Sequence, residues 1–218
     1  MTRKQRPKRL MGQNSNAHRL IGVLELPGTG GRVCGPDEIA EALLDHIQAA
    51  PRAGRRRLIA LVGPPASGKS TLSCILADLL TEAGCRTSVV PMDGFHLDNK
   101  ILTERGLLAR KGAPETFDVD GLLRLVKALH NSSTEYFPTF DRERDIAIAG
   151  AGLVSDECDS VIVEGNYLLL DAPGWRDLND RWDISIQLDV PTPVLRERLV
   201  DRWLSHGLTP DQARSRAE

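Results

Sequence analysis

The sequence lacks any arrangement of cysteines that would indicate a disulfide framework or a metal site. It contains four cysteines among 218 residues, and none are spaced as in a CxxC motif. Few cysteines without such spacing are typical of proteins whose thiols stay reduced. We therefore expect a cytoplasmic protein that binds no metal through cysteine.

Long hydrophobic runs are also missing. No apolar stretch approaches the ~18 residues that a membrane-spanning helix needs, although 41% of the residues are hydrophobic. The first residues lack the apolar core of a secretory signal peptide. We therefore expect no membrane partner.

The chain carries little excess charge, with 28 basic and 30 acidic residues and a net charge of −2. Such a balance gives no general attraction for nucleic acid, so we expect no nucleic-acid partner. The exception is residues 1–24, with six basic side chains and no acidic one. Because glycine and proline then oppose regular structure in LPGTGGRVCGP, we predict a disordered basic tail at residues 1–35. A mitochondrial-type presequence, or a tail that binds RNA or an acidic membrane surface, stays open.

From residue 36 onward, segments with helical spacing alternate with short apolar runs. We predict helices within 36–50, 69–84, 118–131 and 192–207, and buried strands within 58–63, 88–94, 160–166 and 183–190. Such alternation implies one α/β domain over 36–218, with a parallel central sheet and helices on both faces. Ligands of such sheets bind beyond the carboxyl ends of the strands. The loops after Val62, Met92 and Val163 are therefore expected to share one crevice.

A phosphate-binding motif follows the first predicted strand. GPPASGKS matches GxxxxGK[ST] at every fixed position and opens a predicted helix. Backbone N–H groups of such a loop face a phosphate, Lys69 supplies positive charge, and the Ser70 hydroxyl is a Mg²⁺ ligand. The motif predicts a P-loop NTPase, a three-layer sandwich that binds a nucleoside triphosphate. The expected nucleotide-binding residues are Gly63, Pro64, Pro65, Ala66, Ser67, Gly68, Lys69, Ser70 and Thr71.

An acidic residue lies at the end of each of two later strands. Asp93 follows the apolar run in VVPMDGFH, where its carboxylate could accept a proton from an attacking hydroxyl. Glu164 follows the apolar run in VIVEGN, and a buried acid there is costly unless a cation such as Mg²⁺ compensates it. The alternatives are a helix cap or a Mg²⁺-water contact for Asp93, and a structural salt bridge for Glu164.

Arginines occur on the last predicted helix, at Arg196, Arg198 and Arg202. On a mobile lid they would stabilise charge on a transferred phosphoryl group. A solvated helix face is the alternative.

Residues 136–148 (YFPTFDRERDIAI) concentrate aromatic and charged side chains in a chain that has only four Phe and two Tyr. Such a mixture suits a pocket for a small polar molecule, and an ordinary hairpin with surface charges is the alternative. His96 and Lys100, which follow Asp93, are further candidates for substrate contact.

Residues 57–216 resemble the P-loop small-molecule kinases grouped with uridine kinase, phosphoribulokinase and bacterial pantothenate kinase. Four motifs in order carry the resemblance: GPPASGKST, PMDGFH, RKGAPETFD and VIVEGNYLLL. The third is similar to the KGxPESYD segment of pantothenate kinase, and the NKxD guanine motif is absent. MDGFHLDN, FDRERDIAIAG and EGNYLLLDAPGWRDL further resemble a bacterial branch labelled fructose transport system kinase, or nucleoside/nucleotide kinase family.

This resemblance implies transfer of the γ-phosphoryl group of ATP, with Mg²⁺, to a hydroxyl of a sugar, a nucleoside or a pantothenate-like alcohol. It implies that Asp93 is the general base and a Mg²⁺ contact, that Glu164 lies near Mg²⁺, and that Arg198 and Arg202 are lid residues. It also implies an acceptor pocket, with the candidates Lys111, Tyr136, Phe140, Asp141, Arg142 and Asn166.

The sequence leaves a second class of function open. A nucleotide-binding regulator or slow NTP hydrolase would keep the loop and the Mg²⁺ ligands but would not need Asp93 as a base. TFDRERD does not reproduce the Tyr/His pattern of uridine kinases, and relatives usually continue past DQARSRAE through another helix and strand. The acceptor, the C-terminal boundary and the oligomeric state, a homodimer included, stay open.

Overall fold

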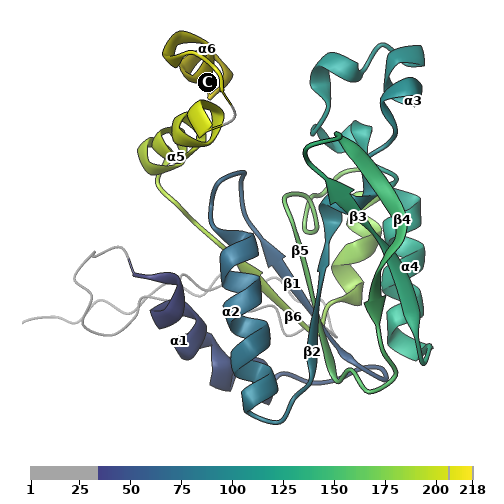
Figure 1. Cartoon of the computed structure of the whole chain (residues 1–218). Coiled ribbons are helices and arrows are strands. Elements are labelled where there is room, and N and C mark those ends of the chain that lie inside the picture. Colours follow the sequence, from purple (N-terminus) through teal and green to yellow (C-terminus); the bar gives the residue numbers. More distant parts are fainter. Residues whose placement is uncertain (1–33, 206, 218) are drawn as a thin grey trace, which may run out of the picture.

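The computed structural model describes residues 34–205 and 207–217, so most of the predicted basic tail lies outside the described residues. Four parallel strands form the central sheet in the order β2-β5-β1-β6 (Figure 1). They are β1 (Arg57–Val62), β2 (Thr87–Pro91), β5 (Ser160–Gly165) and β6 (Ile184–Gln187). The predicted α/β fold with a parallel sheet is confirmed.

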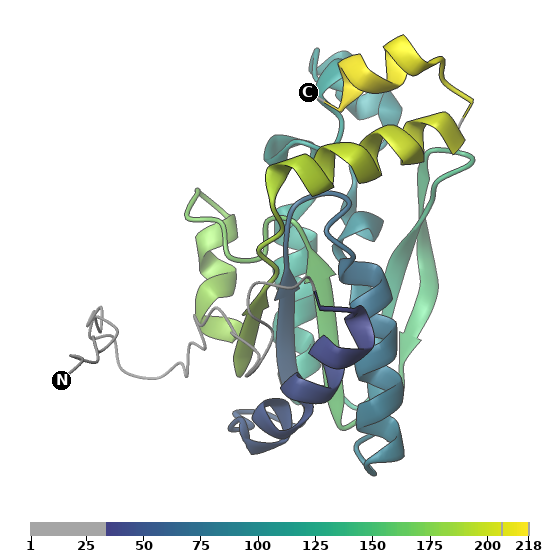
Figure 2. The same cartoon turned by 90° about the vertical axis from the view of Figure 1, so that its left-hand side faces the viewer.

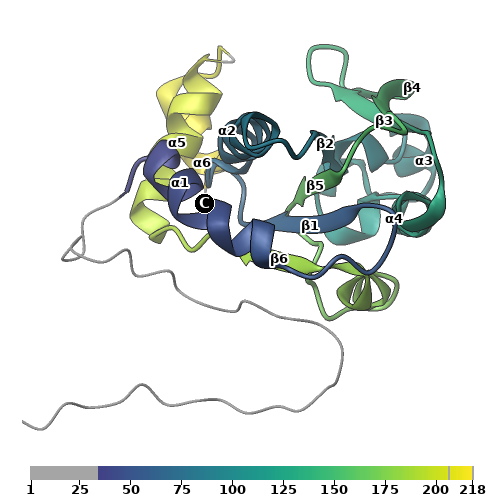
Figure 3. The same cartoon turned by 90° about the horizontal axis from the view of Figure 1, so that it is seen from below.

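Helices cover both faces of this sheet (Figures 1 and 3). One face carries α1 (Pro36–Ala49) and α2 (Lys69–Glu82), and the other carries α4 (Val119–Asn131) and the 3₁₀ segment η4 (Trp175–Arg181). Successive strand residues point to opposite faces, so β1 sends Ile59 and Leu61 to the first face and Leu58 and Ala60 to the second. Strands buried on both sides explain the continuous apolar runs in the sequence.

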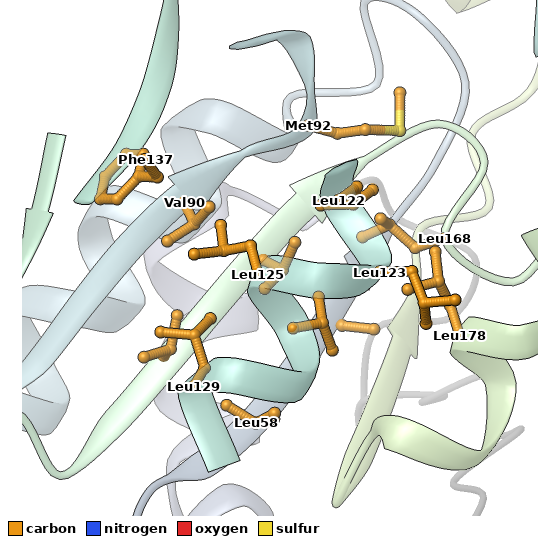
Figure 4. Packing of buried hydrophobic residues seen from close by; sticks show 14 of the residues in the cluster. Leu58, Val90, Met92, Leu122, Leu123, Leu125, Leu129, Phe137, Leu168 and Leu178 are labelled. Carbon is orange, nitrogen blue, oxygen red and sulfur yellow. The ribbon is translucent and has the colours of Figure 1, made fainter. Parts of the chain in front are cut away.

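The packing of α4 shows how its amphipathic pattern becomes core. Figure 4 shows Leu122, Leu125 and Leu129 of this helix gathered with Leu58 of β1 and Val90 of β2. The Asp118 side chain caps the helix by accepting a hydrogen bond from the N–H of Gly121. Burial of these leucines stabilises the domain by roughly 1.5–3 kcal/mol for each side chain.

A fully buried arginine ties the end of α4 to the loops around it. Arg56, immediately before β1, donates hydrogen bonds to the carbonyl oxygens of Leu129 (3.3 Å), Ser132 (2.7 Å), Ser133 and Ser155 (2.7 Å). Carbonyl groups at the C-terminus of a helix lack partners within the helix and carry partial negative charge. The buried guanidinium satisfies the carbonyl group of Leu129 in the last turn of α4, that of the C-cap residue Ser132, and two carbonyl groups of neighbouring segments.

The segment from 135 to 154 forms a separate antiparallel hairpin of β3 (Glu135–Asp141) and β4 (Ile146–Val154). The register shifts between Phe137 and Thr139, on either side of Pro138, a residue that cannot donate to the strand ladder. A Cβ atom on Gly94 would lie 1.9 Å from the carbonyl oxygen of Pro138. Glycine at this position therefore lets the hairpin lie directly against the turn that contains Asp93.

That turn departs from the predicted strand, which was expected to continue to Gly94. β2 ends at Pro91, and residues Met92–Phe95 form the 3₁₀ segment η1, in which the N–H of His96 donates to the carbonyl oxygen of Asp93. The chain then continues through α3 (Asn99–Glu104), η2 (Leu108–Arg110) and η3 (Pro114–Thr116) before α4.

Two C-terminal helices, α5 (Thr192–Ser205) and α6 (Pro210–Arg216), pack together at the end of the domain where the β1–α2 loop lies (Figures 1 and 2). Figure 2 shows α5 crossing above that loop. A capping box formed by Thr209 and Gln212 starts α6. Across the described helices, none has the length and apolarity to cross a membrane.

Candidate active site

The phosphate-binding motif forms the loop between β1 and α2 and the first residues of α2. Gly68 (φ +91°) and Ala66 (φ +62°) both have positive φ angles, which glycine tolerates best. When right-handed and left-handed backbone conformations alternate, successive N–H groups point toward one position, where an anion can bind. The first N–H groups of a helix have no acceptor within the helix, so those at the start of α2 are suited to a phosphate.

A buried hydroxyl in this loop is unsatisfied. Ser67 is 7% exposed, and its Oγ atom has no hydrogen-bond partner among the described residues. A Cβ atom on Gly63 would lie 2.7 Å from that oxygen, so the loop closes tightly around it. A buried polar group without a partner is costly. A ligand that offers a hydrogen bond to Ser67 would remove this cost, so the loop fits a phosphate-bearing ligand.

Lys69 follows this loop as the first residue of α2, and its side chain is buried. Nζ donates to the carbonyl oxygens of Gly63 (2.8 Å) and Pro64 (2.9 Å). Burial lowers the pKa of Lys69, and the nearby carboxylates of Glu164 and Asp93 oppose that shift. Because an ammonium has three N–H donors, one remains for an anionic ligand.

Strand β5 brings Glu164 to the same edge of the sheet. Its register places Glu164 between Leu61 of β1 and Pro91 of β2. The Oγ atom of Ser70 donates to Oε1 of Glu164 at 3.0 Å. Burial raises the pKa of Glu164 above its ordinary value of 4.5, and this rise persists despite the hydrogen bond from Ser70 and the attraction of Lys69. The hydrogen-bond partner of Glu164 is a neutral hydroxyl. Because a buried carboxylate is costly without a cation beside it, a metal ion bound here would stabilise Glu164.

Because its pKa is raised, Glu164 should lower the free energy of unfolding at neutral pH, where it is ionised. The folded protein holds the proton of Glu164 more tightly than the unfolded chain does, so the contribution is favourable below about pH 4.5 and is lost as the pH rises through the folded-state pKa. In Mg²⁺-free buffer, Glu164→Gln should therefore increase the free energy of unfolding at about pH 7.5 relative to wild type, with no gain near pH 4. Urea unfolding at both pH values measures this. Glu157→Gln, an exposed change on a surface ion pair, is the control. A Glu164→Gln protein that is less stable than wild type at neutral pH would contradict the assignment.

The oxygen donors that could hold Mg²⁺ are Ser70, Glu164 and Asp93. In the part of the chain that the structure describes, no group of three or more His, Cys, Asp or Glu side chains is arranged to hold a metal by itself. Mg²⁺ usually keeps several waters and binds through one or two carboxylates together with substrate phosphates. The residues present therefore fit an ion that arrives with a nucleotide.

Asp93 lies on η1, two residues beyond the end of β2. Its carboxylate is 27% exposed and accepts a hydrogen bond from Arg142 of the hairpin, with 2.7 Å between Oδ2 and Nη2. Asp93 also lies close enough to Lys69 and Glu164 to influence the pKa of each. β1, β2 and β5 thus bring the loop lysine and both acids to one edge of the sheet.

His96 packs between two phenylalanines, with ring centroids 4.1 Å from Phe117 and 4.7 Å from Phe140. Its Nδ1 atom lies 2.7 Å from the carbonyl oxygen of Asp93, and because a carbonyl only accepts, Nδ1 carries the proton. Burial lowers the pKa of His96, so the ring is neutral near pH 7. Nε2 can therefore accept a hydrogen bond from a ligand hydroxyl.

Two residues that the sequence did not indicate, Asn99 and Asp145, hold Lys111. Its Nζ atom donates to Oδ1 of Asn99 (2.7 Å) and to the carbonyl oxygen of Asp145 (2.8 Å), and it pairs with Oδ1 of Asp145 (2.9 Å). The Asn99 side chain also donates to Oδ2 of Asp145 (2.8 Å). These partners are 12 and 34 residues away from Lys111 along the chain, so no local spacing could have revealed them. Lys111 also lies 5.0 Å from the ring centroid of Phe140.

A continuous set of contacts therefore joins five of the predicted site residues. We call this set the acceptor-side cluster; it comprises Asp93, His96, Lys111, Phe140 and Arg142.

Three other predicted acceptor residues join the cluster through no hydrogen bond, ion pair or ring contact of the described residues. Tyr136 is 67% exposed on β3, opposite Leu153 of β4. Asp141 accepts hydrogen bonds from the side chain and N–H of Arg144. Asn166 follows β5 and is partly buried.

Two of the predicted lid arginines lie near the phosphate loop. Nη1 of Arg198 on α5 donates to the carbonyl oxygen of Ala66 at 3.3 Å. The charge of Arg202, one turn further along the same helix, contributes to the lowered pKa of Lys69. Both side chains are exposed, which would let them change partner if α5 moves.

Comparisons with known proteins show which proteins the chain is similar to. No protein-family model matches the chain. Over 157 residues the chain is 38% identical to the uncharacterized protein YggC of Escherichia coli, which covers 71% of this chain and 65% of that protein. Over 191 residues it is 38% identical to a "putative uridine kinase" of Schizosaccharomyces pombe, which covers 82% of this chain and 77% of the relative. The chain spans about half (49%) of a pantothenate kinase of Chelativorans sp., to which it is 31% identical over 156 residues.

A solved structure is also similar to this chain, and its name is again that of a kinase. The crystal structure of a "putative fructose transport system kinase" from Silicibacter sp. TM1040 is 55% identical, with a TM-score of 0.78, and the match covers 85% of this chain and 89% of that one. The four motifs, the parallel sheet and these relatives all point to one group of proteins. The chain belongs to the superfamily of P-loop small-molecule kinases that includes uridine kinase and bacterial pantothenate kinase.

Proposed function

We propose that the protein transfers the γ-phosphoryl group of ATP to a hydroxyl group of a small metabolite. The observation that carries this proposal is the position of Asp93 on η1, at the edge of the sheet where Lys69 and Glu164 lie, close enough to influence the pKa of both. A general base must reach the proton of an acceptor hydroxyl that attacks the phosphate. The names of the relatives support a sugar, a nucleoside or a pantothenate-like alcohol as the acceptor.

Each part of the site then has a chemical task. Lys69 offers its remaining N–H donor to a phosphate oxygen, and the N–H groups at the start of α2 orient the phosphate chain. Mg²⁺, when bound, neutralises phosphate charge, and Ser70 and Glu164 are the residues that would hold it.

On the acceptor side, Asp93 takes the proton of the hydroxyl as its oxygen attacks, and the neutral ring of His96 offers an acceptor atom that helps to orient the ligand. Arg198 and Arg202 approach from α5 and stabilise charge on the transferred oxygens. Positioning and charge stabilisation supply most of the rate, as is general for phosphoryl transfer. Residues 36–218 are proposed to act as one kinase domain in the cytoplasm, without a nucleic-acid or membrane partner.

Lys69→Met should weaken nucleotide binding while leaving the fold intact. The change removes one charge-assisted hydrogen bond to phosphate, so we expect affinity for a fluorescent ATP analogue to fall by about 10- to 100-fold. Lys127→Met, an exposed change on α4, is the matched control and should bind like wild type. Equal affinities for the two variants would show that Lys69 does not contact the nucleotide.

The proposal is tested by Mg²⁺-dependent release of ADP from ATP across a panel of sugars, nucleosides and pantothenate. One acceptor class should raise the rate by about 10²-fold or more over basal hydrolysis. If no compound raises the rate, the chain is better described as a nucleotide-binding regulator or slow hydrolase.

A further inference from the structure

The contact between Arg142 and Asp93 constrains the chemistry of the acceptor. Arg142 lies in the turn between β3 and β4, and its Nη2 atom donates to Oδ2 of Asp93 at 2.7 Å. Within residues 34–205 and 207–217, Asp93 is the one group that Arg142 hydrogen-bonds or pairs with. The proposed base is therefore already paired with a cation before any acceptor binds.

The hairpin holds Arg142 in this place from both sides. Before it in the chain, Phe140 stacks on His96 with 4.7 Å between ring centroids. After it, Asp145 is held by Lys111 and by Asn99. The hairpin also touches η1 directly at Gly94. Arg142 can therefore change its partner by a rotation of its own side chain, without movement of the hairpin.

The two other basic side chains that contact the turn, Lys111 and Arg144, already have partners. Lys111 is occupied by Asn99 and Asp145, and Arg144 pairs with Asp141 at 2.8 Å. The guanidinium of Arg142 uses one of its five N–H donors, and its side chain is 55% exposed. It is therefore the cation of this turn that a bound ligand can most readily engage.

An acceptor hydroxyl that gives its proton to Oδ2 of Asp93 must displace the Arg142 guanidinium from that oxygen. If the acceptor is neutral, the displaced guanidinium of Arg142 loses its ion pair with Asp93 and finds no anionic group on the acceptor to replace it. An acceptor with its own carboxylate or phosphate supplies that anion, and the planar fork of arginine matches both groups with two parallel hydrogen bonds.

We propose that the acceptor carries an anionic group, a carboxylate or a phosphate, that binds Arg142 and so releases Asp93 to act on the neighbouring hydroxyl. This inference rests on the proposed function, because it assumes that Asp93 receives the proton of the acceptor. Arg142 then acts as the specificity residue that favours an anionic alcohol over an uncharged sugar or nucleoside.

Matched pairs of compounds test this directly. The carboxylate arms are pantothenate against panthenol and glycerate against glycerol, and the phosphate arm is fructose 6-phosphate against fructose; uridine is a further neutral compound. ADP release by the full chain is measured with Mg²⁺ and ATP for wild type, Arg142→Gln and the control Arg144→Gln. Arg144→Gln removes a charge from the same turn, but from a pair with Asp141.

In at least one arm, wild type should use the anionic compound with a kcat/KM about 10- to 100-fold above that of its neutral partner, as expected for a charge-assisted hydrogen bond. Arg142→Gln should lower kcat/KM for the anionic compound, because it removes the cation that binds the anion. For the neutral compound kcat/KM should stay the same or rise, because the ion pair no longer occupies Oδ2 of Asp93. Arg144→Gln should keep the wild-type preference. The pair of compounds that shows this preference identifies the anionic group of the acceptor as a carboxylate or a phosphate.

A neutral sugar or nucleoside as the best acceptor would overturn the inference and leave the kinase assignment intact. The inference would also be overturned if Arg142→Gln kept the wild-type preference for the anionic compound. The same holds if Arg142→Gln lowered kcat/KM equally for both compounds of a pair. If no compound raises ADP release by wild type, the kinase assignment itself fails, and this inference fails with it.

Discussion

Asp93→Asn should lower acceptor-dependent ADP release by about 10²- to 10⁴-fold, the range lost when a general base is removed. Asparagine keeps the size of the side chain and an oxygen that can accept from Arg142, so the hairpin should stay in place. Its amide cannot take up a proton near neutral pH. The loss should appear in kcat at saturating acceptor, since the change acts on the chemical step.

The control for this variant lies five residues further along the chain. Asp98→Asn also replaces a carboxylate by an amide, at the N-cap of α3, where the side chain accepts from the N–H of Lys100. Asparagine caps helices as well as aspartate does, so this variant should retain wild-type activity. If Asp93→Asn also retained wild-type activity, Asp93 could not be the base.

Arg56→Met should produce the largest loss of stability. Its guanidinium is fully buried and serves carbonyl groups of Leu129, Ser132, Ser133 and Ser155. Methionine fills part of the space but cannot donate, and each buried acceptor left without a partner costs about 1–3 kcal/mol. We expect the free energy of unfolding to fall by about 3–5 kcal/mol and Tm by roughly 10 °C.

Urea unfolding of Arg56→Met beside Arg55→Met separates this role from a general effect of removing charge. The Arg55 side chain is exposed and donates to the carbonyl oxygen of Asp156 at 2.8 Å. Its replacement should change stability by no more than about 0.5 kcal/mol. Similar losses in the two variants would mean that the buried hydrogen bonds of Arg56 contribute little.

The contrast between Arg55 and Arg56 also shows which structural features cannot be predicted from the sequence. In RAGRRR the residues Arg55, Arg56 and Arg57 look alike, because nothing local distinguishes an exposed arginine from a buried one. The carbonyl partners of Arg56 lie 73 to 99 residues away. The strands and amphipathic helices, in contrast, were predictable because apolar runs and 3.6-residue spacing are local properties.

The same division holds in the candidate site. The loop around Lys69 could be predicted because its chemistry lies in one contiguous motif, and Asp93 and Glu164 because parallel strands bring their carboxyl ends to one edge. The pairing of Asp93 with Arg142 spans 49 residues and depends on how the hairpin docks. The predicted extent of β2 was wrong by a few residues, since the strand stops at Pro91 and a 3₁₀ turn carries Asp93.

The fate of the γ-phosphoryl group is the most direct measurement of the proposed activity. The full chain, Mg²⁺, ATP and the best acceptor of the panel are followed together by phosphorus NMR. If the protein is a kinase, a phosphate ester of the acceptor should accumulate in step with ADP. If inorganic phosphate accumulates instead, at the same rate with and without the acceptor, the protein is a slow NTP hydrolase and the kinase assignment is wrong.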